Sequence, residues 1–91
     1  MRVLAVCGFG VGSSMVLKMT LEKAFKELGE EVTVENADMT TAKGDNADAI
    51  FTSKQLVDDF QNAKAPVYGV DSYTKKEEIK QVVQSFLNDK Q

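Results

Sequence analysis

The chain has 91 residues, of which 43% are hydrophobic, 14 acidic and 11 basic, with one cysteine and no histidine. This length suits a single domain, 1–91, and the net charge of −3 gives no reason to expect a nucleic-acid partner. No apolar stretch approaches the roughly 20 residues of a membrane-spanning helix, so direct membrane insertion is not expected. A lone cysteine cannot form an internal disulfide, which favours the cytoplasm. The lack of histidine argues against a metal site and excludes a phosphohistidine on this chain.

The first third of the chain predicts a buried strand, a loop and a helix. Residues 2–7 are almost continuously apolar, which is typical of a strand covered on both faces of a parallel sheet. Apolar residues then recur at spacings of three and four over 17–28, and Gly29 is a suitable helix stop. Ser13 or Ser14 is expected to cap this helix. Met15 and Met19 are interpreted as core filler, with a partner contact left open for Met15.

The rest of the chain predicts three more strands and two more helices. Strands are expected over 31–37, over 49–52 and, after Pro66, over 67–70. A short helix capped by Ser53 should precede the fourth strand. A longer one, opened by a capping box at Thr74–Glu77, should end the chain. The polar segment 38–48 shows no strong helix, so the connection between the second and third strands stays unassigned.

Strands that alternate with helices predict an α/β fold, a three-layer sandwich around a four-stranded parallel sheet in the order 2-1-3-4. Ligands of such sheets bind at the carboxyl ends of the strands. That edge should gather Cys7, Asp38, Thr52–Ser53 and Asp71–Ser72.

The segment Cys7-Gly8-Phe9-Gly10-Val11-Gly12-Ser13-Ser14 combines a thiol with a glycine-rich loop before a helix. The free N–H groups and partial positive charge of a helix N-terminus should bind a phosphoryl group and lower the thiol pKa from about 8.5. The glycines allow a tight turn and close approach of a phosphate. Phe9, at the loop tip, is equally compatible with an exposed docking role and a structural one.

Cys7-Gly8, Gly10, Gly12-Ser13-Ser14-Met15 and Lys18-Met19, behind the apolar strand, resemble the IIB component of a sugar phosphotransferase system (PTS). The likeness is greatest to the ascorbate-type branch of the lactose/ascorbate/galactitol-like superfamily. It implies a flavodoxin-like or low-molecular-weight phosphatase-like fold and a phosphotransferase that needs no cofactor. Cys7 would accept phosphoryl from the phosphohistidine of a IIA protein. It would pass the group to L-ascorbate, or another sugar, on a membrane IIC transporter. The phosphate-binding loop would be Gly8, Phe9, Gly10, Val11, Gly12, Ser13 and Ser14.

A small cysteine-dependent phosphatase is the first alternative. The loop also resembles that of low-molecular-weight tyrosine phosphatases, but Ser13 stands where those enzymes have arginine. The sole arginine, Arg2, should lie at the wrong end of the sheet. Asp71 or Asp38 could imitate the general acid, whereas nothing replaces the guanidinium that stabilises the transferred oxygens. Such a site would form phosphocysteine and hydrolyse it poorly.

A flavodoxin-like module that binds a nucleotide or flavin is the second alternative. Residues 8–13 partly fit a dinucleotide fingerprint, with Glu35 or Asp38 as the acid for the ribose. The third glycine of that fingerprint is replaced by Ser13, and a short single domain lacks the second mononucleotide half.

Overall fold

The computed structural model describes residues 1–6, 11–71 and 75–90; for residues 11–14 and 90 it describes the backbone alone. In chain order the elements are β1 (Arg2–Ala5), α1 (Val11–Glu27), β2 (Thr33–Asn36), α2 (Met39–Gly44), β3 (Ala49–Ser53), the 3₁₀ helix η1 (Lys54–Phe60), β4 (Val67–Val70) and α3 (Lys76–Lys90).

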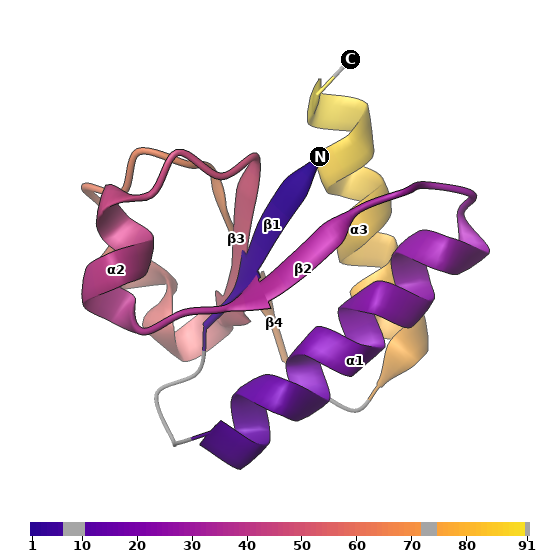
Figure 1. Cartoon of the computed structure of the whole chain (residues 1–91), viewed down its shortest axis with the longest axis horizontal. Coiled ribbons are helices and arrows are strands. Elements are labelled where there is room, and N and C mark those ends of the chain that lie inside the picture. The colour runs from indigo at the N-terminus through magenta and orange to yellow at the C-terminus, as the bar shows by residue number, and fades with distance from the viewer. Residues whose placement is uncertain (7–10, 72–74, 91) are drawn as a thin grey trace.

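The four strands form one parallel sheet in the order β2-β1-β3-β4 (Figure 1), which confirms the predicted class and strand order. Ala5 pairs with Asn36 on β2 and with Phe51 on β3, and Ser53 pairs with Val70 on β4. All four strands therefore finish at one edge of the sheet.

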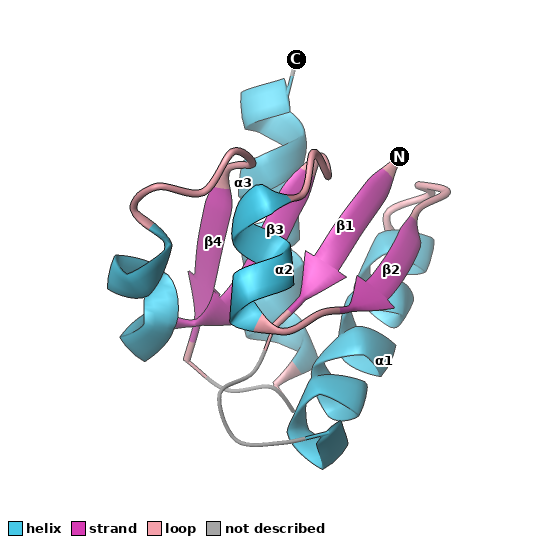
Figure 2. Ribbon diagram, turned by 60° about the vertical axis from the view of Figure 1, so that its left-hand side comes forward, coloured by secondary structure: helices cyan, strands magenta, loops and turns pink. Residues whose placement is uncertain are grey.

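Helices cover both faces of the sheet (Figure 2), with α1 and α3 on one side and α2 and η1 on the other. The larger core lies under α1 and α3, where Phe25, Phe51 and Phe86 meet edge to face with ring centroids 5.8–6.2 Å apart. Strand alternation explains the division, because Phe51 enters this core while its neighbour Ile50 enters the core under α2 and η1.

The connection between the second and third strands is a short helix that the sequence did not predict. Asp38 caps α2 by accepting a hydrogen bond from the Thr41 amide at 2.7 Å. The helix has six residues, too few to show a helical repeat of apolar positions. Ser53 occupies the N-cap position of η1 as predicted, but its side chain makes no capping hydrogen bond.

The predicted start of α1 is wrong, and its predicted end is confirmed. The helix begins at Val11, so Ser13 and Ser14 lie within its first turn and do not cap it. Gly29 ends it as predicted, with φ of 77°. The amides of Gly29 and Glu30 donate to the carbonyls of Lys26 and Phe25 at 3.1 and 2.9 Å, which is a Schellman motif.

Candidate functional site

The chain enters the candidate site where β1 ends. The Val6 amide donates to the carbonyl oxygen of Phe51 at 2.9 Å, which fixes Val6 at the carboxyl edge of the sheet beside β3. Cys7 is the next residue along the chain. It lies outside the described residues together with Gly8, Phe9 and Gly10, and the described chain resumes at Val11 as the first residue of α1.

The helix α1 begins at this edge of the sheet (Figure 1). The N–H groups of Val11, Gly12 and Ser13 belong to the first turn, where an α-helix provides no acceptor for them. The first turn contains no acidic residue that would oppose the positive end of the helix dipole. This end of α1 is therefore suited to a phosphoryl group, in line with the predicted chemistry of the loop.

Two hydroxyl groups at the end of β3 are buried and make no hydrogen bond to any described residue. Thr52 is fully buried, and within residues 1–6, 11–71 and 75–90 neither its Oγ1 nor the Oγ of Ser53 has a partner. Because side chains alternate along a strand, Thr52 faces α2 and η1 with Ile50, whereas Ser53 faces α1 and α3 with Phe51. The sequence placed both residues at this edge but did not assign them to the site.

Strand register places Ser53 at the same edge of the sheet at which β1 ends. Ala5 pairs with Phe51, and Ser53 follows Phe51 by two residues; in the sequence, Cys7 likewise follows Ala5 by two. A buried hydroxyl without a partner usually costs stability, since it has lost its hydrogen bonds to water. Since it lies at the edge where ligands of parallel sheets bind, the Ser53 hydroxyl is a candidate ligand-binding group.

The two acids predicted near this edge have other partners. The Asp38 carboxylate caps α2, and the hydrogen bond from the Thr41 amide lowers the pKa of Asp38, so this group is poorly suited to hold a proton as a general acid. Asp71 is exposed and accepts a hydrogen bond from Lys54 Nζ at 2.9 Å. Ser72 lies outside the described residues.

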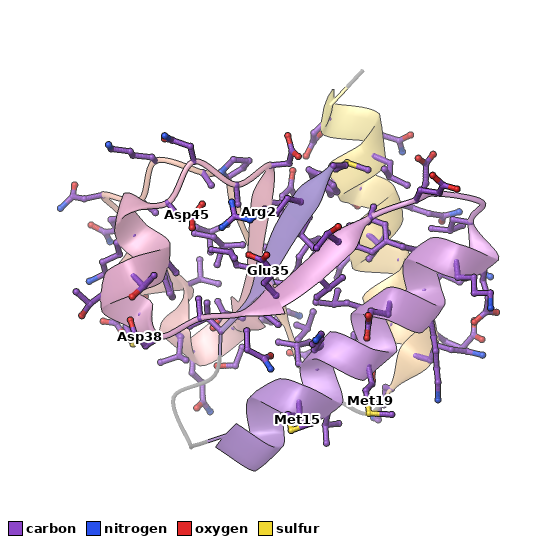
Figure 3. The ribbon with its side chains drawn as sticks, viewed as in Figure 1. Arg2, Met15, Met19, Glu35, Asp38 and Asp45 are labelled. Carbon is purple, nitrogen blue, oxygen red and sulfur yellow. The ribbon has the colours of Figure 1, made fainter. Side chains whose placement is uncertain are left out.

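Arg2 lies at the opposite end of the sheet, as the sequence predicted. Its Nη1 and Nη2 donate to the two carboxylate oxygens of Asp45 at 2.7 and 2.6 Å, and its Nε donates to Glu35 at 2.8 Å (Figure 3). These bonds raise the pKa of Arg2 and lower that of Asp45. The guanidinium that a phosphatase loop would need is thus held by carboxylates at the start of β1. Glu35, a candidate for the ribose acid, is one of these partners.

A groove of about 400 Å³ lies at the amino end of the sheet, between β4 and α3, and is lined by Asp48, Pro66, Tyr68, Phe86 and Asp89. Tyr68 donates to Asp89 at 2.8 Å, and burial together with this bond raises the Tyr68 pKa to about 12. Asp48 and Pro66 directly precede β3 and β4, so the groove lies away from the edge that Cys7 follows.

Comparison with known proteins decides the family. The family model for the lactose/cellobiose-specific IIB subunit of the PTS matches residues 2–85. The chain belongs to the PTS IIB family. Over 90 residues it is 40% identical to the ascorbate-specific PTS system EIIB component of Mycoplasma pneumoniae, covering 96% of this chain and 95% of that protein.

A solved structure supports the fold. The lactose-specific IIB domain of the PTS from Streptococcus pneumoniae superposes with a TM-score of 0.64 at 14% sequence identity, covering 100% of this chain and 98% of that one. The predicted resemblance is confirmed, and this IIB protein is a phosphotransferase component of a sugar-transport system. Within residues 1–6, 11–71 and 75–90, no helix is long and apolar enough to cross a bilayer.

Proposed function

We propose that this IIB protein carries a phosphoryl group on Cys7, from the phosphohistidine of a IIA protein to a substrate held by a membrane IIC transporter. The observation that carries the proposal is the position of the only cysteine. Cys7 follows the last residue of β1 by two positions and precedes the first residue of α1 by four, in a phosphotransferase that contains no histidine.

The proposed reaction consists of two in-line transfers. The Cys7 thiolate attacks phosphorus, and a P–S bond forms as the P–N bond of the phosphohistidine breaks. The histidine nitrogen keeps the electron pair and takes up one proton, which balances the proton that the thiol lost on becoming a thiolate. A hydroxyl oxygen of the substrate then attacks the same phosphorus, so that a P–O bond forms, the P–S bond breaks and the thiolate is restored. The substrate's hydroxyl proton goes to a base of the IIC complex or to water.

Neutral hydrogen-bond donors would hold the transferred oxygens. The proposed cradle is the loop Gly8, Phe9, Gly10, Val11, Gly12, Ser13 and Ser14. We add the hydroxyl of Ser53 as a donor, because it is buried without a partner among the described residues, at the edge of the sheet where β1 ends. Such groups stabilise the charge that develops on the phosphoryl oxygens in the transition state.

The position of Arg2 favours a carrier over a phosphatase. Hydrolysis of phosphocysteine would benefit from a guanidinium that neutralises two oxygens at once, and Arg2 instead binds Asp45 and Glu35 at the other end of the sheet. Asp38, one candidate for the leaving-group acid, is held in its ionised form by its capping bond. The site would therefore keep its phosphoryl group until an acceptor arrives.

L-ascorbate is the proposed substrate, with another sugar as the alternative. The relative named ascorbate-specific is 40% identical across nearly the whole chain, whereas the lactose-specific domain is 14% identical and shows the fold alone. The proposed compartment is the cytoplasm, where a IIA protein and the inner face of a IIC transporter would both be accessible.

Phosphoryl labelling tests the proposed function. Phosphoenolpyruvate with the general PTS proteins and a matching IIA should label the wild-type chain, while Cys7→Ser and alkylated wild type should stay unlabelled. The Cys7→Ser chain should keep the wild-type circular dichroism spectrum, because oxygen for sulfur is a small steric change. Label on Cys7→Ser, or label transferred from ATP alone, would contradict the carrier assignment. Turnover of p-nitrophenyl phosphate would favour the phosphatase, and the visible absorbance of a bound flavin would favour the nucleotide-binding alternative.

A further inference from the structure

The first half of α1 carries an exposed apolar surface, which we call the α1 patch and define as Met15, Val16 and Met19. Their side chains are 51%, 40% and 53% exposed, so the prediction that both methionines fill the core is wrong. Figure 3 shows Met15 and Met19 on the side of α1 turned away from the sheet. Among the described residues the only other large hydrophobic exposed to this degree is Met1. Exposed apolar groups that cluster on one helix side mark a contact surface.

Three lysines lie along α1 near the α1 patch. Lys18 is half-buried and Lys23 and Lys26 are exposed along the same helix, and none of the three forms an ion pair with another described residue. The acid at the end of α1, Glu27, is bound by lysines of α3 at 2.9 and 3.9 Å. Glu22 is then the one acid of α1 left to oppose three lysines. This surface is basic although the chain as a whole carries a net charge of −3.

We propose that the α1 patch docks the phosphoryl-donor protein, a IIA protein whose contacting face is apolar at its centre and acidic at its rim. This inference rests on the proposed function. A donor histidine must reach the edge that Cys7 follows, and α1 begins there, four residues further along the chain. A second copy of this chain fits less well, because it would bring the same lysines face to face across a symmetric contact.

Saturation kinetics with phosphorylated IIA test the docking role. In Met19→Glu, a negative charge replaces an exposed apolar side chain, and we expect the KM for phospho-IIA to rise about tenfold with little change in kcat. The double variant Met15→Ala, Met19→Ala removes apolar contact without adding charge and should raise KM in the same direction. Gln84→Glu, an equal charge change at an exposed position of α3, is the matched control and should leave KM unchanged.

Alkylation of Cys7 by iodoacetamide separates docking from damage to the loop. The alkylation rate should be the same in the wild type and in all these variants. In a separate measurement, higher salt should raise the wild-type KM for phospho-IIA, because salt screens the charges of Lys18, Lys23 and Lys26. Unchanged KM in Met19→Glu and in the double variant would overturn the proposal, as would an equal rise in Gln84→Glu or an altered alkylation rate. Normal uptake from IIA with a selective loss of transfer to IIC would overturn it as well, by assigning the patch to the acceptor. Failure of the wild-type chain to accept phosphoryl would refute the proposed function instead.

Discussion

Replacing Ser53 by alanine should make the protein a poorer phosphoryl carrier without making it less stable. The Ser53 hydroxyl is buried at the carboxyl end of β3 and has no hydrogen-bond partner in the part of the chain that the structure describes. It makes no hydrogen bond to another described residue, so its removal eliminates a desolvated polar group. In the phosphorylated chain, by our proposal, it donates to an oxygen of the phosphoryl group.

The magnitudes follow from these two environments. An unsatisfied buried hydroxyl costs about 1–3 kcal/mol. Removing the hydroxyl removes this cost, but the small void left by the oxygen offsets part of the gain in stability. The unfolding free energy of Ser53→Ala should therefore stay level or rise by up to about 2 kcal/mol. A hydrogen bond to a charged acceptor is worth about 1.5–3 kcal/mol, which corresponds to a loss of roughly ten- to a hundredfold in the transfer rate.

Thr52→Val is the matched control for Ser53→Ala. Thr52 is the adjacent residue and is fully buried. Its hydroxyl also lacks a partner among the described residues, but it faces α2 and η1. Valine has nearly the same shape, so this variant should gain comparable stability while transferring phosphoryl at the wild-type rate. Urea unfolding of the unphosphorylated proteins and rapid-quench transfer from phospho-IIA give the two quantities for each variant.

Two results would refute the reasoning. Wild-type transfer by Ser53→Ala would show that the hydroxyl does not contact the phosphoryl group. A loss of more than about 1 kcal/mol of stability in Ser53→Ala would show that the hydroxyl already has a partner before phosphorylation. Reduced transfer in Thr52→Val would indicate that both variants act through the end of the strand as a whole.

Two further predictions concern stability. Gly69→Ala should destabilise the protein by about 1–3 kcal/mol, because the added Cβ would lie 2.7 Å from the Val57 side chain. Urea unfolding measures the change in stability. The control is Gly44→Ala, where an added Cβ meets nothing within 4 Å and should cause no loss of stability. The bond from Arg2 lowers the Asp45 pKa, so the unfolded chain binds more protons below the ordinary value of 3.8, and stability should fall as pH drops through that range. In Asp45→Asn the unfolding free energy should decrease less between neutral pH and about pH 3 than in the wild type. The same decrease in both proteins would contradict this role of the Arg2–Asp45 pair.

The predictable parts of the fold are those that depend on local periodicity. The buried strands and the apolar face of α1 repeat over several residues, and Gly29 is required by its φ of 77°. The six-residue α2 is too short to reveal a repeat, although Asp38 followed three residues later by Thr41 contained its capping signal. The exposure of Met19 was available from the sequence, because Met19 stands two residues from both Leu17 and Leu21. That spacing is 200° around a helix and points away from their buried face.

The candidate site was less predictable because its defining contacts join distant segments. The sequence identified the Cys7 loop and placed Ser53 at the carboxyl edge, but the only role it gave Ser53 was that of a helix cap. The unsatisfied state of the Ser53 hydroxyl depends on β1 and β4 enclosing β3. The partners of Arg2 are 33 and 43 residues away along the chain, and only the strand order brings them to one end of the sheet.

Arg2 lies at the end of the sheet opposite to the candidate site, and this placement suits a protein that stores a phosphoryl group and transfers it. A phosphoryl group held by a guanidinium would gain strong charge-assisted bonds but would also be activated toward water and released less readily to an acceptor. In this protein Arg2 is bound to Asp45 and Glu35 at the amino end. At the carboxyl edge Lys54 is bound to Asp71, and the donors that we assign to the phosphoryl group are backbone amides of α1 and the Ser53 hydroxyl. The lysines of α1 lie near the α1 patch, where they can attract a donor protein. Attraction of the partner and retention of the phosphoryl group would thereby depend on different residues, so that partner affinity can change without promoting hydrolysis of the intermediate.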